Sequence, residues 1–160
     1  MPALSSTTAK WIVVVYNVGA IIGGLFFGSM SQRFSRRYTV VFCALLGLPV
    51  VPLFAFSRTA AMLCLGSFLM QVCVQGAWGV IPAHMNELSP PHLRGFLPGF
   101  AYQIGMVCAG VAPYIETVMG EHFSYAQSMG YLAGAALILG MIVIGLGPEA
   151  HGINFRKTAA

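Results

Sequence analysis

The charged residues of this chain stand far apart, and their spacing constrains the fold more than any motif does. Five stretches of at least 20 residues contain no Asp, Glu, Lys or Arg. A helix needs about 20 apolar residues to cross roughly 30 Å of hydrocarbon. Such stretches form helices because a spanning segment must satisfy its own backbone hydrogen bonds. The sequence therefore predicts an all-α, polytopic transmembrane helix bundle with helices at about 11–31, 38–56, 61–83, 96–117 and 126–147.

Composition agrees with a lipid environment. Of 160 residues, 58% are hydrophobic and only 8% are charged, whereas soluble domains carry about 25% charged residues. The net charge of +4 comes from basic residues scattered along the chain, and nucleic-acid binding needs a dense basic stripe. We therefore expect the lipid bilayer as partner and no nucleic acid. The predicted connections are short, so residues 1–160 are expected to form a single membrane domain.

The basic residues also predict an orientation. Cytoplasmic loops are enriched in Lys and Arg, which places the C-terminus inside and the N-terminus outside a plasma (cell inner) membrane as a multi-pass protein. The first residues lack the pattern of a cleavable signal peptide, and a start on the outer side is natural if another helix precedes it. The residues assigned to the inner side are Arg33, Arg36, Arg37, Arg94, Arg156 and Lys157, against Lys10 and Arg58 outside.

Neither catalysis nor metal binding has support in the sequence. The four cysteines, Cys43, Cys64, Cys73 and Cys108, fall inside predicted helices without a Cys-x-x-Cys pair, and small buried thiols explain them. A metal site from His84, Glu87 and His92 is disfavoured because the prolines between them bend the chain. No nucleophile–base pair lies at mid-helix depth. We expect no enzyme, no cofactor and no metal.

Glycines recur at about four-residue intervals in two predicted helices. Small residues at this spacing let helix backbones approach closely in lipid, although membrane helices are also enriched in glycine generally. Either interpretation implies a bundle and names no function. The glycines are Gly19, Gly23, Gly24 and Gly28 in 11–31, and Gly130, Gly134 and Gly140 in 126–147.

The first connection carries a specific motif. Residues 28–37 read Gly-Ser-Met-Ser-Gln-Arg-Phe-Ser-Arg-Arg, which resembles the major-facilitator signature Gly-x-Leu-Ala-Asp-Arg-x-Gly-Arg-Arg. Gln32 and Ser35 replace the Asp and the second Gly of that signature. The resemblance implies a cytoplasmic latch between helices, while three arginines that merely hold a short loop inside are the alternative.

The third connection resembles a second transporter pattern, Glu-x-x-Pro-x-x-x-Arg-Gly. Glu87 ends one predicted helix, the following prolines break it, and Arg94 opens the next. A carboxylate and a guanidinium at the membrane edge can pair and gate; an ordinary surface pair is the alternative. The candidates for cytoplasmic gating are Gly28, Arg33, Arg36, Arg37, Glu87 and Arg94.

Further segments narrow the resemblance to one family. Residues 16–20, 75–82, 100–105 and 147–149 are similar to the sialate:proton symporter family, which includes the fungal lactate permeases. The resemblance implies helices eight to twelve of a twelve-helix protein, without its first half. It also implies that Gln103 matches a position involved in binding monocarboxylates, whereas Met106 replaces an Asn of the family pattern.

Function is therefore expected to be transmembrane transport of a small, lactate- or pyruvate-like carboxylate by proton symport. The chain would act as a C-terminal part, paired with a missing N-terminal half or with a second copy in a homodimer, because no acidic group stands at mid-helix for a proton relay. A non-transporting membrane remnant or helix-bundle scaffold is the alternative, and an intramembrane enzyme a distant one. The candidates for the substrate pathway, which could equally be polar contacts between helices, are Gln103, Tyr102, Asn17, Gln71 and Gln75.

Overall fold

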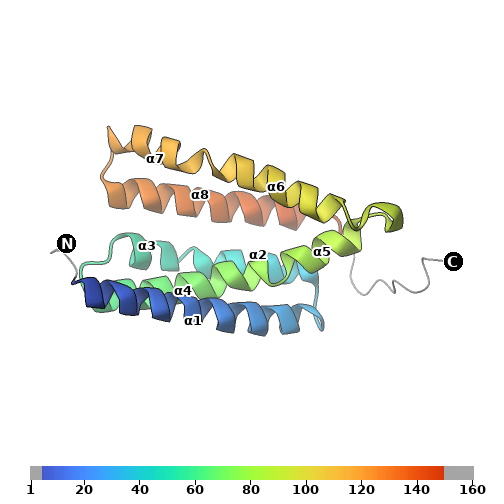
Figure 1. Ribbon diagram of the computed structural model, residues 1–160, viewed down its shortest axis with the longest axis horizontal. Coiled ribbons are helices and arrows are strands. Elements are labelled where there is room, and N and C mark those ends of the chain that lie inside the picture. Colours follow the sequence, from blue (N-terminus) through green and yellow to red (C-terminus); the bar gives the residue numbers. More distant parts are fainter. Residues whose placement is uncertain (1–4, 150–160) are drawn as a thin grey trace.

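A computed structural model describes residues 5–149, and all the regular structure in that range is helical. The predicted all-α bundle is therefore confirmed. Figure 1 shows long helices running roughly parallel to one another, with α6, α7 and α8 on one side of the bundle and α1 to α5 on the other. The elements are α1 (Ser6–Ser31), α2 (Arg36–Gly47), α3 (Val50–Ala55), α4 (Ala60–Trp78), α5 (Ile81–Leu88), η1 (Pro91–Leu93), α6 (Leu97–Ala109), α7 (Ala112–Gly120) and α8 (Tyr125–Leu146).

Hydroxyl side chains begin four of these helices. Ser5, Ser35 and Thr59 each accept a hydrogen bond from a backbone N–H in the first turn of α1, α2 and α4. At α8, Ser124 and Gln127 form a capping box. Such caps satisfy backbone donors that the first turn leaves unpaired. The helix starts are therefore encoded locally.

Prolines divide three of the predicted spans. The span at 38–56 is divided into α2 and α3 around Pro49, the span at 61–83 continues past a turn into α5 with Pro82 near its start, and the span at 96–117 is divided into α6 and α7 before Pro113. A proline removes a helical hydrogen bond and clashes with the preceding turn. By length and hydropathy, three stretches of the described residues could cross a membrane, namely Ser6–Ser31, Ala60–Leu88 and Tyr125–Leu146.

Helices α1 and α4 form the most extensive contact of the described bundle. A Cβ added at Gly19 would lie 2.6 Å from the Phe68 carbonyl oxygen, and one added at Gly23 would overlap the backbone of Val72. In return, a Cβ at Gly79 would lie 2.7 Å from the carbonyl oxygen of Gly24. The glycines of α1 therefore allow the two backbones to touch, as small residues do in membrane helices.

The glycines of α8 behave differently. A Cβ added at Gly130 would lie 3.4 Å from the Cβ of Ala55, an ordinary contact, whereas a Cβ added at Gly134 or Gly140 would meet no atom of another described segment within 4 Å. The repeated spacing in α8 therefore marks no close helix contact within residues 5–149. Helix α8 packs mainly on α2, with further contacts to α3 and α7.

Candidate functional site

An ionic cluster lies where the start of α2 meets the ends of α5 and α8, at the right-hand end of the bundle in Figure 1. We call it the arginine cluster, and its members are Ser31, Ser35, Arg36, Arg37, Glu87 and Glu149. Local sequence positions its two arginines. Ser35 caps α2 by accepting a hydrogen bond from the Tyr38 amide at 3.2 Å, so that Arg36 and Arg37 occupy the first turn of the helix.

Arg36 and Glu87 form a largely buried ion pair. The Arg36 Nη2 lies 3.0 Å from Glu87 Oε1, and Arg36 Nε lies 3.3 and 3.2 Å from the two carboxylate oxygens. The two side chains are only 13% and 7% exposed. Arg36 Nη1 also donates to the hydroxyl of Ser31 at 2.8 Å, and this hydroxyl donates to the Gly28 carbonyl at 2.8 Å. The pair therefore ties α2 to the end of α5, and Ser31 anchors it to α1.

Arg37 holds the other side of the cluster. Its Nη1 donates to the Gly147 carbonyl at 2.8 Å, and its backbone N–H donates to Glu149 Oε2 at 3.1 Å. The Ser35 hydroxyl donates to the same carboxylate oxygen. Arg37 also stacks over the Tyr38 ring, 4.8 Å from its centroid. These contacts fasten the segment after α8 to the start of α2.

The surroundings of Glu149 favour its charged form. Burial by itself raises the pKa of this carboxyl, but the hydrogen bonds from the Ser35 hydroxyl and the Arg37 amide outweigh that effect. The electrostatic interaction with His84 and a hydrogen bond from the Arg36 amide act in the same direction, so the pKa is lowered. Hydrogen bonds to a carboxylate stabilise it over the acid. Glu149 is therefore an ionised acceptor at neutral pH.

His84 lies beside this cluster, close enough to interact electrostatically with Glu149, but it makes none of the hydrogen bonds described above. Its side chain is 4% exposed, and Nδ1 has no hydrogen-bond partner among the described residues. His92 is exposed in η1. Among residues 5–149, no three His, Cys, Asp or Glu side chains gather as metal ligands would.

The remaining gating candidates lie around the cluster. Gly28 contributes the carbonyl that accepts from Ser31. Arg94 donates from Nε to the Ser89 carbonyl at 3.1 Å, which closes the turn between α5 and α6. Arg33 is exposed and forms no ion pair with any residue from 5 to 149. The structure thus joins two of the predicted loop segments through Arg36 and Glu87.

The predicted pathway residues lie apart from one another. Gln71 is buried in α4 and Gln75 is half-buried one turn on. Asn17 is exposed and donates to the Val13 carbonyl of its own helix at 2.7 Å. Tyr102 packs edge-on against Trp78, with 5.6 Å between the ring centroids. The exposed Gln103 lies next to Tyr102 in α6, so α4 and α6 carry most of the candidates.

Comparison with known proteins decides the family. The sequence profile of the Major Facilitator Superfamily matches residues 3–158. The chain belongs to the Major Facilitator Superfamily. The curated relatives that match this chain are named as transporters, and its long apolar helices agree with a membrane-embedded bundle.

Two curated relatives illustrate the similarity. The chain is 32% identical to a carboxylic acid transporter protein homolog of Saccharomyces cerevisiae, over 91% of this chain and 26% of that protein. It is 29% identical to the facilitated glucose transporter member 1 of Gallus gallus, over 93% of this chain and 31% of that protein. The chain therefore spans between about a quarter and a third of the length of these relatives.

A solved structure shows the same fold. The crystal structure of a double-tryptophan mutant of XylE superposes with a TM-score of 0.74 at 19% identity, over 92% of this chain and 37% of that one. XylE bound to 6-bromo-6-deoxy-D-glucose, described as a proton:xylose symporter, gives a TM-score of 0.68 at 20% identity. These matches confirm that the helices form part of a major-facilitator bundle.

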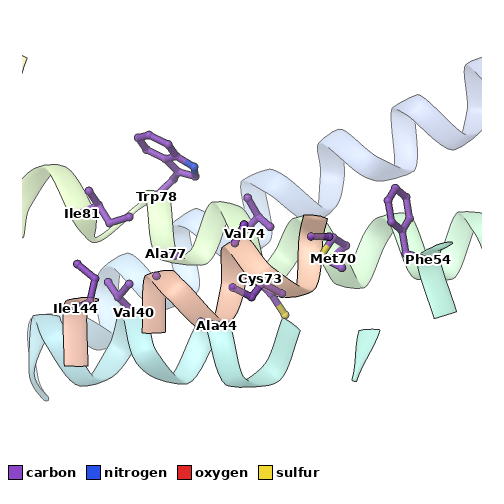
Figure 2. Close-up of a pocket in the computed structure, with 14 residues that line it drawn as sticks. Val40, Ala44, Phe54, Met70, Cys73, Val74, Ala77, Trp78, Ile81 and Ile144 are labelled. Atoms are coloured by element: carbon purple, nitrogen blue, oxygen red, sulfur yellow. The ribbon is translucent and has the colours of Figure 1, made fainter. Parts of the chain in front are cut away.

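An apolar hollow of this major-facilitator chain lies between α2, α3, α4, the start of α5, and α8. It holds about 380 Å³. Its labelled side chains in Figure 2 are hydrocarbon except for the sulfurs of Met70 and Cys73 and the indole nitrogen of Trp78. A carboxylate needs charged or hydrogen-bonding donors when it leaves water. This hollow by itself is therefore unsuited to a carboxylate.

Three members of the arginine cluster were absent from the predicted site. Ser31 and Ser35 were read only as parts of the loop motif, and Glu149 only as part of a family resemblance. Ser35 carried one usable signal, because a serine just before a helix start predicts a cap. The contact of Glu149 with Arg37 joins residues 112 apart in sequence, and no local pattern predicts such a pair.

Proposed function

We propose that this chain is the C-terminal part, helices eight to twelve, of a permease that carries a small lactate- or pyruvate-like carboxylate together with a proton. The observation that carries the proposal is the 32% identity, over 91% of the chain, to a carboxylic acid transporter protein homolog.

In this proposal the arginine cluster is a cytoplasmic latch. Transporters of this kind expose a central site alternately as one bundle moves against another. The Arg36–Glu87 pair and the contacts of Arg37 with Gly147 and Glu149 link three separate segments at one end of the bundle. Such charged contacts are strong when closed and can be exchanged for water when open. The latch therefore favours the state in which this end is closed.

The carboxylate site would be completed by protein outside this chain. Helix α6 carries Tyr102 and Gln103, and none of its residues is buried within residues 5–149. Polar side chains in membrane helices face a protein interior or a cavity. Gln103 can donate two hydrogen bonds to a carboxylate, so α6 is the helix that faces the substrate once a first half or a second copy is present.

Uptake measurements test this proposal. The chain is expressed in a host without monocarboxylate permeases, alone and together with the first seven helices of a lactate permease, and uptake of labelled lactate, pyruvate and glucose is recorded. We expect proton-dependent lactate or pyruvate uptake only with the added helices. Glucose uptake without carboxylate uptake would contradict the substrate class. Saturable, uncoupler-sensitive carboxylate uptake by the chain alone would instead support a homodimer.

The orientation is tested separately. Six basic residues on one side against two on the other favour a cytoplasmic C-terminus. A reporter that is active only in the cytoplasm should be active after Ala160 and silent before Met1. The reverse pattern would place the arginine cluster outside and end its role as a cytoplasmic latch.

A further inference from the structure

Two hollows lie side by side at the junction of α1 and α2, next to the arginine cluster. The first holds about 520 Å³ and is lined by Leu25, Phe26, Ser29, Met30, Arg33 and Phe34. The second holds about 330 Å³ and is lined by Met30, Phe34, Tyr38, Thr39 and Phe42. The hollows share Met30 and Phe34, so these two side chains form the ridge between them.

The hollows carry one arginine, Arg33, that forms no ion pair in the part of the chain that the structure describes. Arg36 is paired with Glu87, and Arg37 is held by Gly147 and Tyr38. Arg33 is exposed, forms no ion pair with residues 5–149 and lines the first hollow. Ser29 is exposed on the same face, four residues earlier along the chain. A guanidinium and a hydroxyl thus stand at the rim of an apolar surface, and both can donate to a phosphate.

The apolar lining extends from Arg33 toward the middle of both helices. Leu25 and Phe26 lie about 10–12 Å back along α1 from Arg33, at 1.5 Å per residue, and they are 69% and 60% exposed. Phe42 lies in α2, which runs back along the bundle from the same loop. The linings of the two hollows therefore reach from the loop with Arg33 toward the apolar parts of α1 and α2.

We propose that this surface binds one anionic phospholipid. The phosphate lies at Arg33 and Ser29, and the two acyl chains lie in the two hollows, one on each side of the Met30–Phe34 ridge. Basic residues at the membrane surface attract anionic lipid headgroups, and exposed hydrocarbon is suited to acyl chains rather than to water. A free phosphate would use only the rim, so the paired hollows favour a diacyl lipid.

Native mass spectrometry of the full chain tests this site, with phosphatidylglycerol and phosphatidylcholine as probes. We expect phosphatidylglycerol to bind more tightly, and Arg33→Gln to weaken its binding about fivefold, since a basic residue near the surface contributes about 1 kcal/mol. Arg58→Gln is the matched control, because Arg58 is an exposed arginine in the connection between α3 and α4. Arg33→Lys keeps the charge and should retain most of the affinity.

A second variant tests the ridge. Phe34→Ala merges the two hollows, so it should reduce the preference for phosphatidylglycerol over its one-chain lyso form, while Arg33→Gln should weaken both lipids alike. Far-UV circular dichroism confirms that each variant keeps its helices. If Arg33→Gln and Arg58→Gln weaken phosphatidylglycerol binding equally, the lipid is attracted by positive charge in general and not bound at this surface. No weakening by Arg33→Gln would exclude Arg33 as the contact of the phosphate. Either result overturns the proposal.

Discussion

Replacing Glu87 with Gln tests the arginine cluster most directly. The substitution keeps the shape of the side chain and removes the charge that faces Arg36. Removing one partner of a buried pair is strongly destabilising, by about 3–5 kcal/mol, because the other charge stays buried without compensation. Arg36 retains its hydrogen bond to Ser31 and is 13% exposed. We therefore expect the lower end of that range, about 3 kcal/mol, or more than a hundredfold in the folding equilibrium.

The assay is unfolding by dodecyl sulfate in mixed micelles, followed by far-UV circular dichroism. Glu121→Gln is the control, since it makes the same chemical change at an exposed carboxylate at the end of α7. A cycle with Arg36→Gln isolates the interaction between the two side chains. The double variant should be more stable than the sum of the single losses implies. The reasoning is refuted if Glu87→Gln loses no more unfolding free energy than Glu121→Gln. A coupling energy near zero between Glu87 and Arg36 would refute it as well.

Three further predictions follow from single positions. Gly23→Ala should destabilise the chain by about 1–3 kcal/mol in thermal unfolding, since its Cβ would lie 2.8 Å from the Val72 Cα. Gly24→Ala is the control and should unfold like the wild type, because its Cβ would meet its nearest atom at 3.6 Å. Glu149 has a pKa below its ordinary value of 4.5, so its contribution to stability is present above pH 4.5 and lost as pH falls through the lowered folded-state pKa. The stability gap between wild type and Glu149→Gln should therefore narrow on acidification in thermal melts, and a constant gap from pH 7 to pH 3 would contradict the lowered pKa. In a chain supplied with a first half, Gln103→Ala should weaken carboxylate affinity about ten- to a hundredfold without changing the protein level. A lower protein level with unchanged affinity would instead show that Gln103 serves in helix packing.

The sequence by itself determined the class of this protein. Stretches without charge are a local property, and they require helices because lipid offers no hydrogen-bond partner to a bare backbone. The helix caps and the breaks near Pro49 and Pro113 are also local, because a hydroxyl or a proline acts on the turn that contains it. The loop motif with Arg36 and the second loop with Glu87 were likewise identified as ionic, each on its own.

Only the tertiary structure decided which charges meet. The sequence offered Glu87 and Arg94 as a pair seven residues apart, whereas the structure pairs Glu87 with Arg36, 51 residues away. It also distinguished two similar glycine patterns, since a Cβ at Gly23 would overlap the backbone of α4 while a Cβ at Gly134 would meet no other described segment within 4 Å. Ion pairs and close helix contacts depend on how helices are placed relative to one another. That placement results from packing over the whole bundle, and a spacing along one helix does not record it.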